Sequence, residues 1–138
     1  MSQYEYYRDD LYIILVAGSR DWDDAEAIRR ELVRAKEKAA HRQMIVVHGH
    51  CRGADRIADS IAVELGIQVV RVPALWKSYG RSAGPRRNGT IAALFEFDET
   101  LFFPLQHSVG TYDMENRAKI RVPLDLFSKS LFTDEDVS

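Results

Sequence analysis

Cysteine is almost absent from the 138 residues: the single Cys51 cannot form a disulfide within the chain. Small secreted domains depend on disulfides, so we expect a reducing compartment and a cytoplasmic location. Eight glycines and four prolines are too few for a collagen-like or low-complexity chain. No apolar run approaches the roughly 20 residues that span a bilayer. Residues 1–10 lack the pattern of a secretory signal, and we expect no membrane association.

Net charge is also small, because 19 basic and 21 acidic residues leave a formal charge of −2. A protein that coats duplex DNA is usually strongly basic, so this class is not favoured. Hydrophobic residues reach 46% and aromatic residues 10%, which suits a folded chain rather than a disordered one. A chain of this length supports one core. We predict one domain over residues 11–126, between an N-terminal tail (1–10) and an acidic C-terminal tail (127–138).

Short apolar runs alternate with stretches of helical period, which is typical of a parallel sheet flanked by helices. Strands are predicted at residues 11–17, 44–48, 67–72, 100–103 and 120–126. Helices are predicted from about Asp23, over residues 54–65, after Pro85 and up to Lys119, with residues 73–84 irregular. Asp23 and Glu26 have the spacing of an N-cap pair. Right-handed crossovers then predict an α/β fold, a doubly wound parallel sheet of about five strands in the order 3-2-1-4-5.

Glycine accompanies polar or basic residues in four predicted loops after strands, at residues 18–20, 49–53, 80–88 and 109–111. Glycine lets a backbone approach a ligand closely, and helix N-termini supply free N–H groups that stabilise anions. Any one of these loops could be only a tight turn. Because the carboxyl ends of parallel strands share one edge of the sheet, we expect the four loops to form one ligand site there.

Basic residues dominate one stretch of the chain. No acidic residue lies between Glu64 and Glu96, whereas five basic residues do: Arg71, Lys77, Arg81, Arg86 and Arg87. The guanidinium fork binds two phosphate oxygens at once, so this excess favours an anionic ligand. Helix capping or plain surface exposure remains the alternative for individual arginines.

A metal site is the first alternative for the run that contains His48, His50 and Cys51. Zinc requires three or four ligands that usually come from separate segments, and no second CxxC or HxxxH group is present. We therefore predict no metal and no cofactor, with His48 as a hydrogen-bonding residue at a strand end and Cys51 as a small buried residue. A nucleophilic Cys51 is disfavoured because the sequence identifies no base for it.

Three aromatic residues near the predicted sheet edge, Trp22, Trp76 and Tyr79, are candidates for stacking on a base. Packing is the more common role of such residues.

Four runs, in this order, resemble one family: residues 18–22 (GSRDW), 48–55 (HGHCRGAD), 84–88 (GPRRN) and 110–114 (GTYDM). Over about residues 11–126 the chain resembles a SLOG superfamily domain, and more narrowly the small bacterial and phage branch of that superfamily. The superfamily also contains the Lonely Guy phosphoribohydrolases and the DNA-processing protein A. Each motif alone is weak, but four in order are fairly specific. The resemblance implies a Rossmann-like domain that binds a nucleotide or nucleotide-derived phosphate ligand.

Site residues follow from the resemblance by position. Arg87 stands where the family's site arginine stands, and Gly110 and Thr111 would donate hydrogen bonds to phosphate. Asp55 would repel phosphate if it pointed inward, so it would more naturally accept from ribose hydroxyls or cap its helix. The complete set of expected ligand-binding residues is Gly18, Ser19, Arg20, Gly49, Arg52, Gly53, Asp55, Arg81, Gly84, Arg87, Asn88, Gly110 and Thr111.

One departure from the family bears on catalysis. Lonely Guy enzymes carry a P-G-G-x-G-T-x-x-E motif, and Met114 occupies the glutamate position here. Methionine can neither activate water nor stabilise an oxocarbenium ion. The candidate catalytic residues are therefore Arg87 with Asp113 or Glu115 in place of the glutamate. Asp113 also fits the G-T-x-D-M form of the small branch.

These observations favour a binding domain for a nucleotide-like small molecule, with sensing or processing of that ligand as extensions. Two alternatives stay open. One is an N-glycoside hydrolase that releases a base from a nucleoside monophosphate, and the other is binding of single-stranded nucleic acid through the basic loop. By analogy with other Rossmann-like domains we expect a homodimer, with the helix after Pro85 as a candidate interface.

Overall fold

The sheet of the computed structural model, which describes residues 10–106 and 108–120, is parallel throughout and has the strand order β3-β2-β1-β4. The strands are β1 (Leu11–Gly18), β2 (Gln43–His48), β3 (Gln68–Arg71) and β4 (Glu99–Phe103). This result confirms the α/β class and the predicted order of the first four strands. Of the fifth predicted strand, Ile120 ends a helix instead, and residues 121–126 lie outside the described residues.

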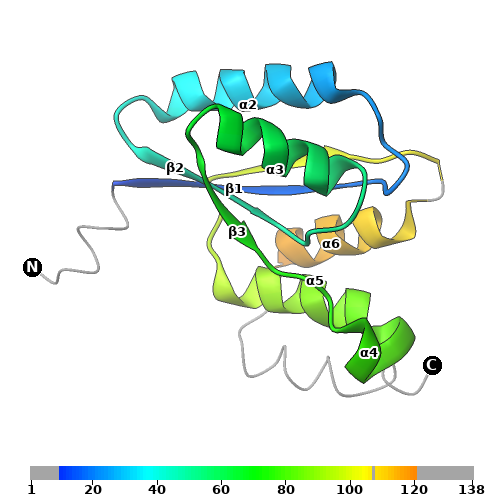
Figure 1. The fold of residues 1–138 in the computed structure, drawn as a ribbon. Coiled ribbons are helices and arrows are strands. Elements are labelled where there is room, and N and C mark those ends of the chain that lie inside the picture. The colour runs from blue at the N-terminus through cyan, green and yellow to red at the C-terminus, as the bar shows by residue number, and fades with distance from the viewer. Residues whose placement is uncertain (1–9, 107, 121–138) are drawn as a thin grey trace, which may run out of the picture.

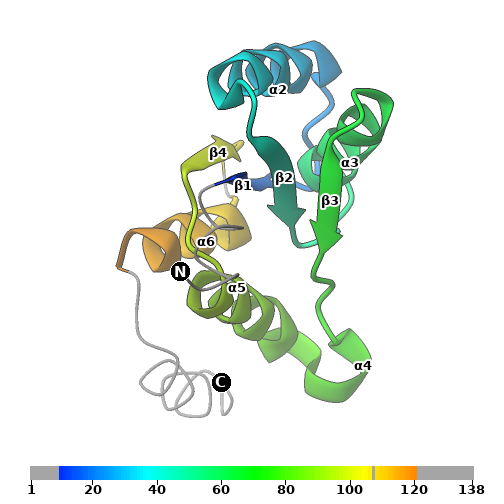
Figure 2. The same ribbon diagram turned by 90° about the vertical axis from the view of Figure 1, so that its left-hand side faces the viewer.

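Helices cover both faces of the sheet, as Figure 1 shows. They are α2 (Ala25–Ala39), α3 (Ala54–Glu64), α4 (Trp76–Tyr79), α5 (Ala83–Leu94) and α6 (Val109–Ile120), with a 3-10 turn at Gly80–Ser82. Helices α2 and α3 lie on one face, and α5 and α6 lie on the other. Figure 2 shows that β3 leads away from the sheet into α4, which adjoins one end of α5. No helix in residues 10–106 and 108–120 is long and apolar enough to cross a membrane.

The central strand β1 divides two layers of core. Ile14 and Val16 are fully buried against the layer of α2 and α3, whereas Leu15 is fully buried against Ile91 and Met114 in the layer of α5 and α6. Because successive side chains of a strand point to opposite faces, an apolar run without alternation is required for a strand covered on both sides. The apolar run that begins at Leu11 meets this requirement.

Two local predictions need correction. Helix α2 is capped by Asp24, whose Oδ1 accepts from the Ala27 N–H at 3.1 Å, and not by Asp23. The carbonyl of Asp23 instead accepts from the Ala25 N–H at 3.1 Å. Residues 76–82 are helical rather than irregular, and because Trp76 and Tyr79 are exposed, these turns have no buried stripe that periodicity could detect.

The end of β1 is joined tightly to its neighbours, and this junction positions the loops described below. The Ser19 N–H donates to the Phe103 carbonyl at 2.9 Å, and the Ser19 carbonyl accepts from the Ala54 N–H at 3.1 Å. A Cβ atom on Gly18 would lie 2.4 Å from the Cβ of Ala54 and 2.8 Å from the Phe103 carbonyl oxygen. Only glycine permits this approach of β1, β4 and α3.

Candidate functional site

A pocket of about 370 Å³ opens at the carboxyl edge of the sheet, beside the point where the strand order reverses between β1 and β4. This volume lies within the range of small-molecule sites, roughly 300–1,000 Å³. The lining residues come from four segments: residues 15–21, then Gly49, Cys51, Arg52 and Asp55, then Arg87, Asn88 and Ile91, then residues 108–111 and Met114. The edge and the switch point are where ligands bind in doubly wound sheets.

The structure brings most of the expected ligand residues together at this pocket. Those that line it are Gly18, Ser19, Arg20, Gly49, Arg52, Asp55, Arg87, Asn88, Gly110 and Thr111. Three others lie elsewhere. Gly53 packs under the loop after β1, and Arg81 is exposed in the 3-10 turn. Gly84 lies beside Trp76, because a Cβ atom on Gly84 would be 3.2 Å from the Trp76 ring.

Gly53 shapes the site although it does not line it. Its φ is +80°, a conformation that other residues adopt only with strain. A Cβ atom there would lie 2.4 Å from the Ser19 carbonyl oxygen. Glycine therefore allows residues 49–53 to lie against the loop after β1.

Arg87 is held in one orientation by three hydrogen bonds. Its Nη1 donates to the Gly49 carbonyl at 2.5 Å, its Nε donates to Asn88 Oδ1 at 2.7 Å, and its Nη2 donates to Cys51 Sγ at 3.5 Å. A guanidinium has five N–H groups, so two remain for a ligand. A Cβ atom on Gly49 would lie 2.3 Å from Arg87 Nη1, and glycine at 49 therefore makes room for this arrangement.

Asn88 connects α5 to α6 behind the pocket. Its Nδ2 donates to the Gly110 carbonyl at 3.2 Å and to Asp113 Oδ2 at 3.0 Å. Asp113 Oδ2 also accepts from Arg117 Nε at 2.9 Å. Neither Asp113 nor Glu115, the proposed substitutes for the family glutamate, is among the residues that line the pocket, whereas Met114 is buried in its wall.

Asp55 is the buried carboxylate of the pocket, with 5% of its surface exposed. In the first turn of α3, its Oδ2 accepts from the Cys51 N–H at 3.2 Å. Its Oδ1 is buried and has no hydrogen-bond partner among the described residues. Burial raises the pKa of Asp55 to about 6, although the backbone N–H groups of Cys51 and Gly49 and the charges of Arg87 and Arg20 oppose the rise.

The five basic residues of the acid-free stretch are dispersed and are not gathered at one ligand site. Arg71 pairs with Asp59 at 2.6 Å, and Arg86 lies over the Tyr79 ring at 4.3 Å. Of that stretch, only Arg87 lines the pocket. The other lining cations are Arg20 and Arg52, which precede the stretch. An anionic ligand of this pocket therefore stays a prediction, and four of the five basic residues of the acid-free stretch do not line the pocket.

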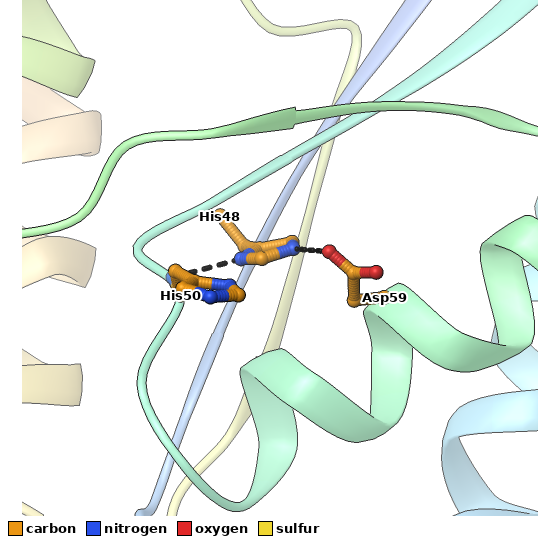
Figure 3. A group of neighbouring side chains, drawn as sticks. All are labelled: His48, His50 and Asp59. Carbon is orange, nitrogen blue, oxygen red and sulfur yellow. Dashed lines mark hydrogen bonds and ion pairs between the residues drawn. The ribbon is translucent and has the colours of Figure 1, made fainter.

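His48, His50 and Asp59 form a cluster whose potential ligand atoms lie within 4.8 Å of one another (Figure 3). His48 Nδ1 accepts from the His50 N–H at 2.8 Å, so its Nε2 carries the proton that it donates to Asp59 Oδ2 at 2.7 Å. Arg71 donates to both oxygens of Asp59, at 2.6 and 2.9 Å. His48 and Asp59 already have partners, and the Arg71 guanidinium occupies the carboxylate, whereas His50 Nδ1 is buried without a hydrogen-bond partner among the described residues. The bonds of His48 and Asp59 support the loop at residues 49–53.

The aromatic candidates also lie away from the pocket lining. Trp22 packs against Phe103 with ring centroids 5.3 Å apart. Arg20 lies over the Trp76 ring at 5.1 Å, and Tyr79 is covered by Arg86. Trp22 thus has the packing role, and the exposed rings of Trp76 and Tyr79 each make a cation–π contact with an arginine.

Sequence reasoning missed several residues of the pocket wall, notably Cys51, Asp21, Ile91 and Ser108 as ligand-lining residues. Asp21 and Cys51 lie inside the quoted motifs, but nothing in the sequence indicates that their side chains face a ligand. Ile91 follows Arg87 by one helical turn, so its place on the same face of α5 was available from helical periodicity.

Comparisons with known proteins identify a family and a phage relative of the chain. The family model described as "YspA, cpYpsA-related SLOG family" matches residues 12–79, which include the loops after β1 and β2. The chain is also 34% identical over 117 residues to the Gene 61 protein of Mycobacterium phage D29, with 80% of this chain and 92% of the phage protein aligned. No solved structure matches the chain.

Proposed function

Because the chain belongs to the YspA, cpYpsA-related SLOG family, we propose that its pocket binds a nucleotide or a nucleotide-derived phosphate ligand. The observation that carries this proposal is the convergence of a preoriented arginine, Arg87, with the N-terminus of α6 in one pocket. The family membership supports a nucleotide-related ligand, and the geometry supports a phosphate.

The phosphate would lie between Arg87 and the start of α6. The first N–H groups of a helix have no partner within the helix and carry the positive end of its dipole, so they stabilise anions. At α6 these groups belong to Val109, Gly110 and Thr111, all of which line the pocket. Gly110 has open space at its Cβ position, so a ligand can approach the backbone there.

Calorimetry and thermal shift with AMP, ADP-ribose and NAD test the proposal. We expect at least one of them to bind, and Arg87→Ala to weaken that binding by roughly 10- to 100-fold, since a hydrogen bond to a charged group contributes about 1.5–3 kcal/mol. Arg86→Ala is the matched control, because the Arg86 side chain lies on Tyr79 and Ser82 and not in the pocket. Flat responses across the panel, or equal losses in the two variants, would contradict the proposal.

A second function, hydrolysis of the N-glycosidic bond of a nucleoside monophosphate, is favoured by one observation. Asp55 is a pocket carboxylate whose pKa is raised by burial to about 6, the range in which a carboxyl group acts as a general acid. It would take the part that sequence reasoning gave to Asp113 or Glu115. Chromatography after long incubation of AMP at high protein concentration decides the matter, because absence of free adenine would eliminate this function. Asp55→Asn is the control for any adenine that appears.

A further inference from the structure

A buried carboxylate is unexpected beside a phosphate site, and Asp55 is such a group. Its backbone is in the first turn of α3, where an acidic side chain commonly caps the helix. Here the N-cap is Gly53, which has no side chain, and the Asp55 side chain turns back to the Cys51 N–H. This bond occupies Oδ2 and leaves Oδ1 buried without a partner among the described residues.

The Cys51 N–H accounts for Oδ2, and the Gly49 N–H also lowers the pKa of Asp55 but does not complete a hydrogen bond to Oδ1. One acceptor is enough to hold the Cys51 N–H, and an asparagine would supply it without burying a charge. A buried polar atom without a hydrogen bond is destabilising, so a residue of this kind in a pocket wall indicates a donor on the ligand.

The surrounding charges indicate the chemistry of that donor. Arg20 and Arg87 both act on Asp55 electrostatically, and both line the same pocket. Two guanidinium groups would repel a ligand ammonium group, and Asp55 itself would repel a phosphate. A neutral hydroxyl group satisfies the carboxylate oxygen and is compatible with the two arginines.

We infer that Asp55 accepts a hydrogen bond from a sugar hydroxyl of the ligand, so that the pocket selects ribose-containing phosphates over their deoxy counterparts. The phosphate lies at the α6 end beside Arg87, and the sugar lies toward the first turn of α3. This inference rests on the proposed function. It adds that the pocket recognises the sugar of the ligand, through Asp55, as well as the phosphate.

Calorimetry with AMP, 2′-deoxy-AMP and 3′-deoxy-AMP tests the inference on the wild type and on Asp55→Asn. In the wild type we expect AMP to bind roughly 10- to 100-fold more tightly than at least one deoxy analogue, because the hydrogen bond is made to a charged group. In Asp55→Asn this preference should fall about fivefold or more, since a neutral acceptor remains. Ribose 5-phosphate and 2-deoxyribose 5-phosphate provide the same comparison without a base.

Asp21→Asn is the matched control, because it removes an exposed carboxylate from the mouth of the same pocket. It should change the affinities for AMP and its analogues together and preserve their ratio. Thermal unfolding of Asp55→Asn verifies that this variant is folded, and Asp55→Ala, which lacks any acceptor, should abolish the preference.

Each outcome has a defined meaning. Equal binding of AMP and both deoxy analogues by the wild type overturns the inference and leaves the proposed function standing. A preference for AMP that survives unchanged in both Asp55 variants overturns the assignment to Asp55. Failure of every nucleotide and sugar phosphate to bind overturns the proposed function and the inference with it.

Discussion

Arg87 and Asp55 differ in how many of their hydrogen-bonding atoms have partners within the protein. The guanidinium of Arg87 donates to the Gly49 carbonyl, Asn88 and Cys51, which orient its remaining N–H groups before a ligand arrives. Asp55 has one satisfied oxygen and one that is buried without a partner among the described residues. A preoriented donor lowers the entropy lost on binding, whereas an unsatisfied carboxylate lowers the stability of the free protein. Both properties suit a binding site.

Asp55→Asn should stabilise the free protein at pH 7. Burial raises the pKa of Asp55 to about 6 from its ordinary value of 3.8, so the folded protein binds the proton more tightly than the unfolded chain. The charged carboxylate therefore destabilises the fold above pH 6, by at most about 3 kcal/mol for a shift of roughly two pKa units. Urea denaturation should show a gain of about 1–3 kcal/mol for the variant at pH 7. The gain should shrink between pH 6 and 4 and vanish at lower pH; a wild type that is more stable at pH 7 would contradict this.

Gly49→Ala should impair binding with little loss of stability. The three atoms nearest to the new Cβ would all belong to the guanidinium of Arg87, the far end of a flexible side chain that can move away. We expect AMP to bind about tenfold more weakly, as hydrogen bonds to a misplaced guanidinium are lost.

Gly66→Ala is the matched control for that substitution. Gly66 has a φ of +74° and open space around its Cβ position, and it is not among the residues that line the pocket. It should lose roughly 1 kcal/mol of stability through backbone strain and retain its affinity for AMP. Equal affinities of the two variants would show that Gly49 does not position Arg87.

Much of the candidate site could be predicted at the residue scale, because glycine-rich ends of parallel strands must meet at one edge. Arg87, Asn88, Gly110 and Thr111 were expected from their positions in the family motifs and line the pocket, and their contact with a ligand stays a prediction. The unsatisfied oxygen of Asp55 could not be predicted, since it depends on which way one side chain turns at the start of α3. The dispersal of Arg71 and Arg86 likewise depends on partners far away in the sequence.

The elements around the pocket are held together by a chain of polar contacts. Arg71 at the end of β3 donates to Asp59 in α3, Asp59 accepts from His48 at the end of β2, and His48 accepts from the His50 N–H. Three elements are thereby joined to the loop that carries Gly49 and Cys51. The structure agrees with the expectation that His48 is a hydrogen-bonding residue at a strand end.

Asp59→Asn should loosen this loop. The Arg71 guanidinium holds the pKa of Asp59 near 2, so the contribution of the ion pair is present above about pH 4 and is lost as pH falls through 2. Amide hydrogen exchange by NMR should show faster exchange of the His50 N–H in the variant at neutral pH.

Glu64→Gln is the control for that measurement. Glu64 lies in the same helix, is exposed and pairs with Arg29. Its loss should leave the exchange of the His50 N–H unchanged, because exposed pairs contribute little and this one does not contact the loop. Equal acceleration in both variants would contradict the supporting role of Asp59.

Elements with a buried stripe could be predicted, and elements without one could not. Helix α3 matches its predicted range within one residue because Ala58, Ile61 and Ala62 recur on a buried face. Helix α4 has no buried residue, so nothing in its sequence distinguishes it from a loop. The N-cap of α2 was misplaced by one position because Asp23 and Asp24 are chemically equivalent caps.

For the whole molecule, the pocket account competes with binding of single-stranded nucleic acid. Such binding requires a basic groove and accessible aromatic faces. Here the basic residues are dispersed, and Arg20 and Arg86 each lie over one face of the exposed rings of Trp76 and Tyr79. The homodimer stays a prediction, and sedimentation equilibrium would test it.

We predict that a single-stranded oligonucleotide gives no gel shift at low ionic strength with protein that responds to a nucleotide in calorimetry. Arg81→Ala, which removes an exposed arginine outside the pocket, should leave the nucleotide response unchanged. A salt-sensitive gel shift that Arg81→Ala weakens, together with no nucleotide response, would favour the nucleic-acid alternative instead.

The most direct test of ligand binding in this pocket uses Cys51, which is the single cysteine of the chain and lines the pocket beside Arg87. The rate of its alkylation by iodoacetamide is measured with increasing AMP, ADP-ribose or NAD, for the wild type and for Arg87→Ala. The account predicts that at least one nucleotide slows alkylation of the wild type in a saturable manner, and that Arg87→Ala requires roughly tenfold more or greater concentrations of it. A rate that no nucleotide alters, in a protein shown to be folded, would contradict the account.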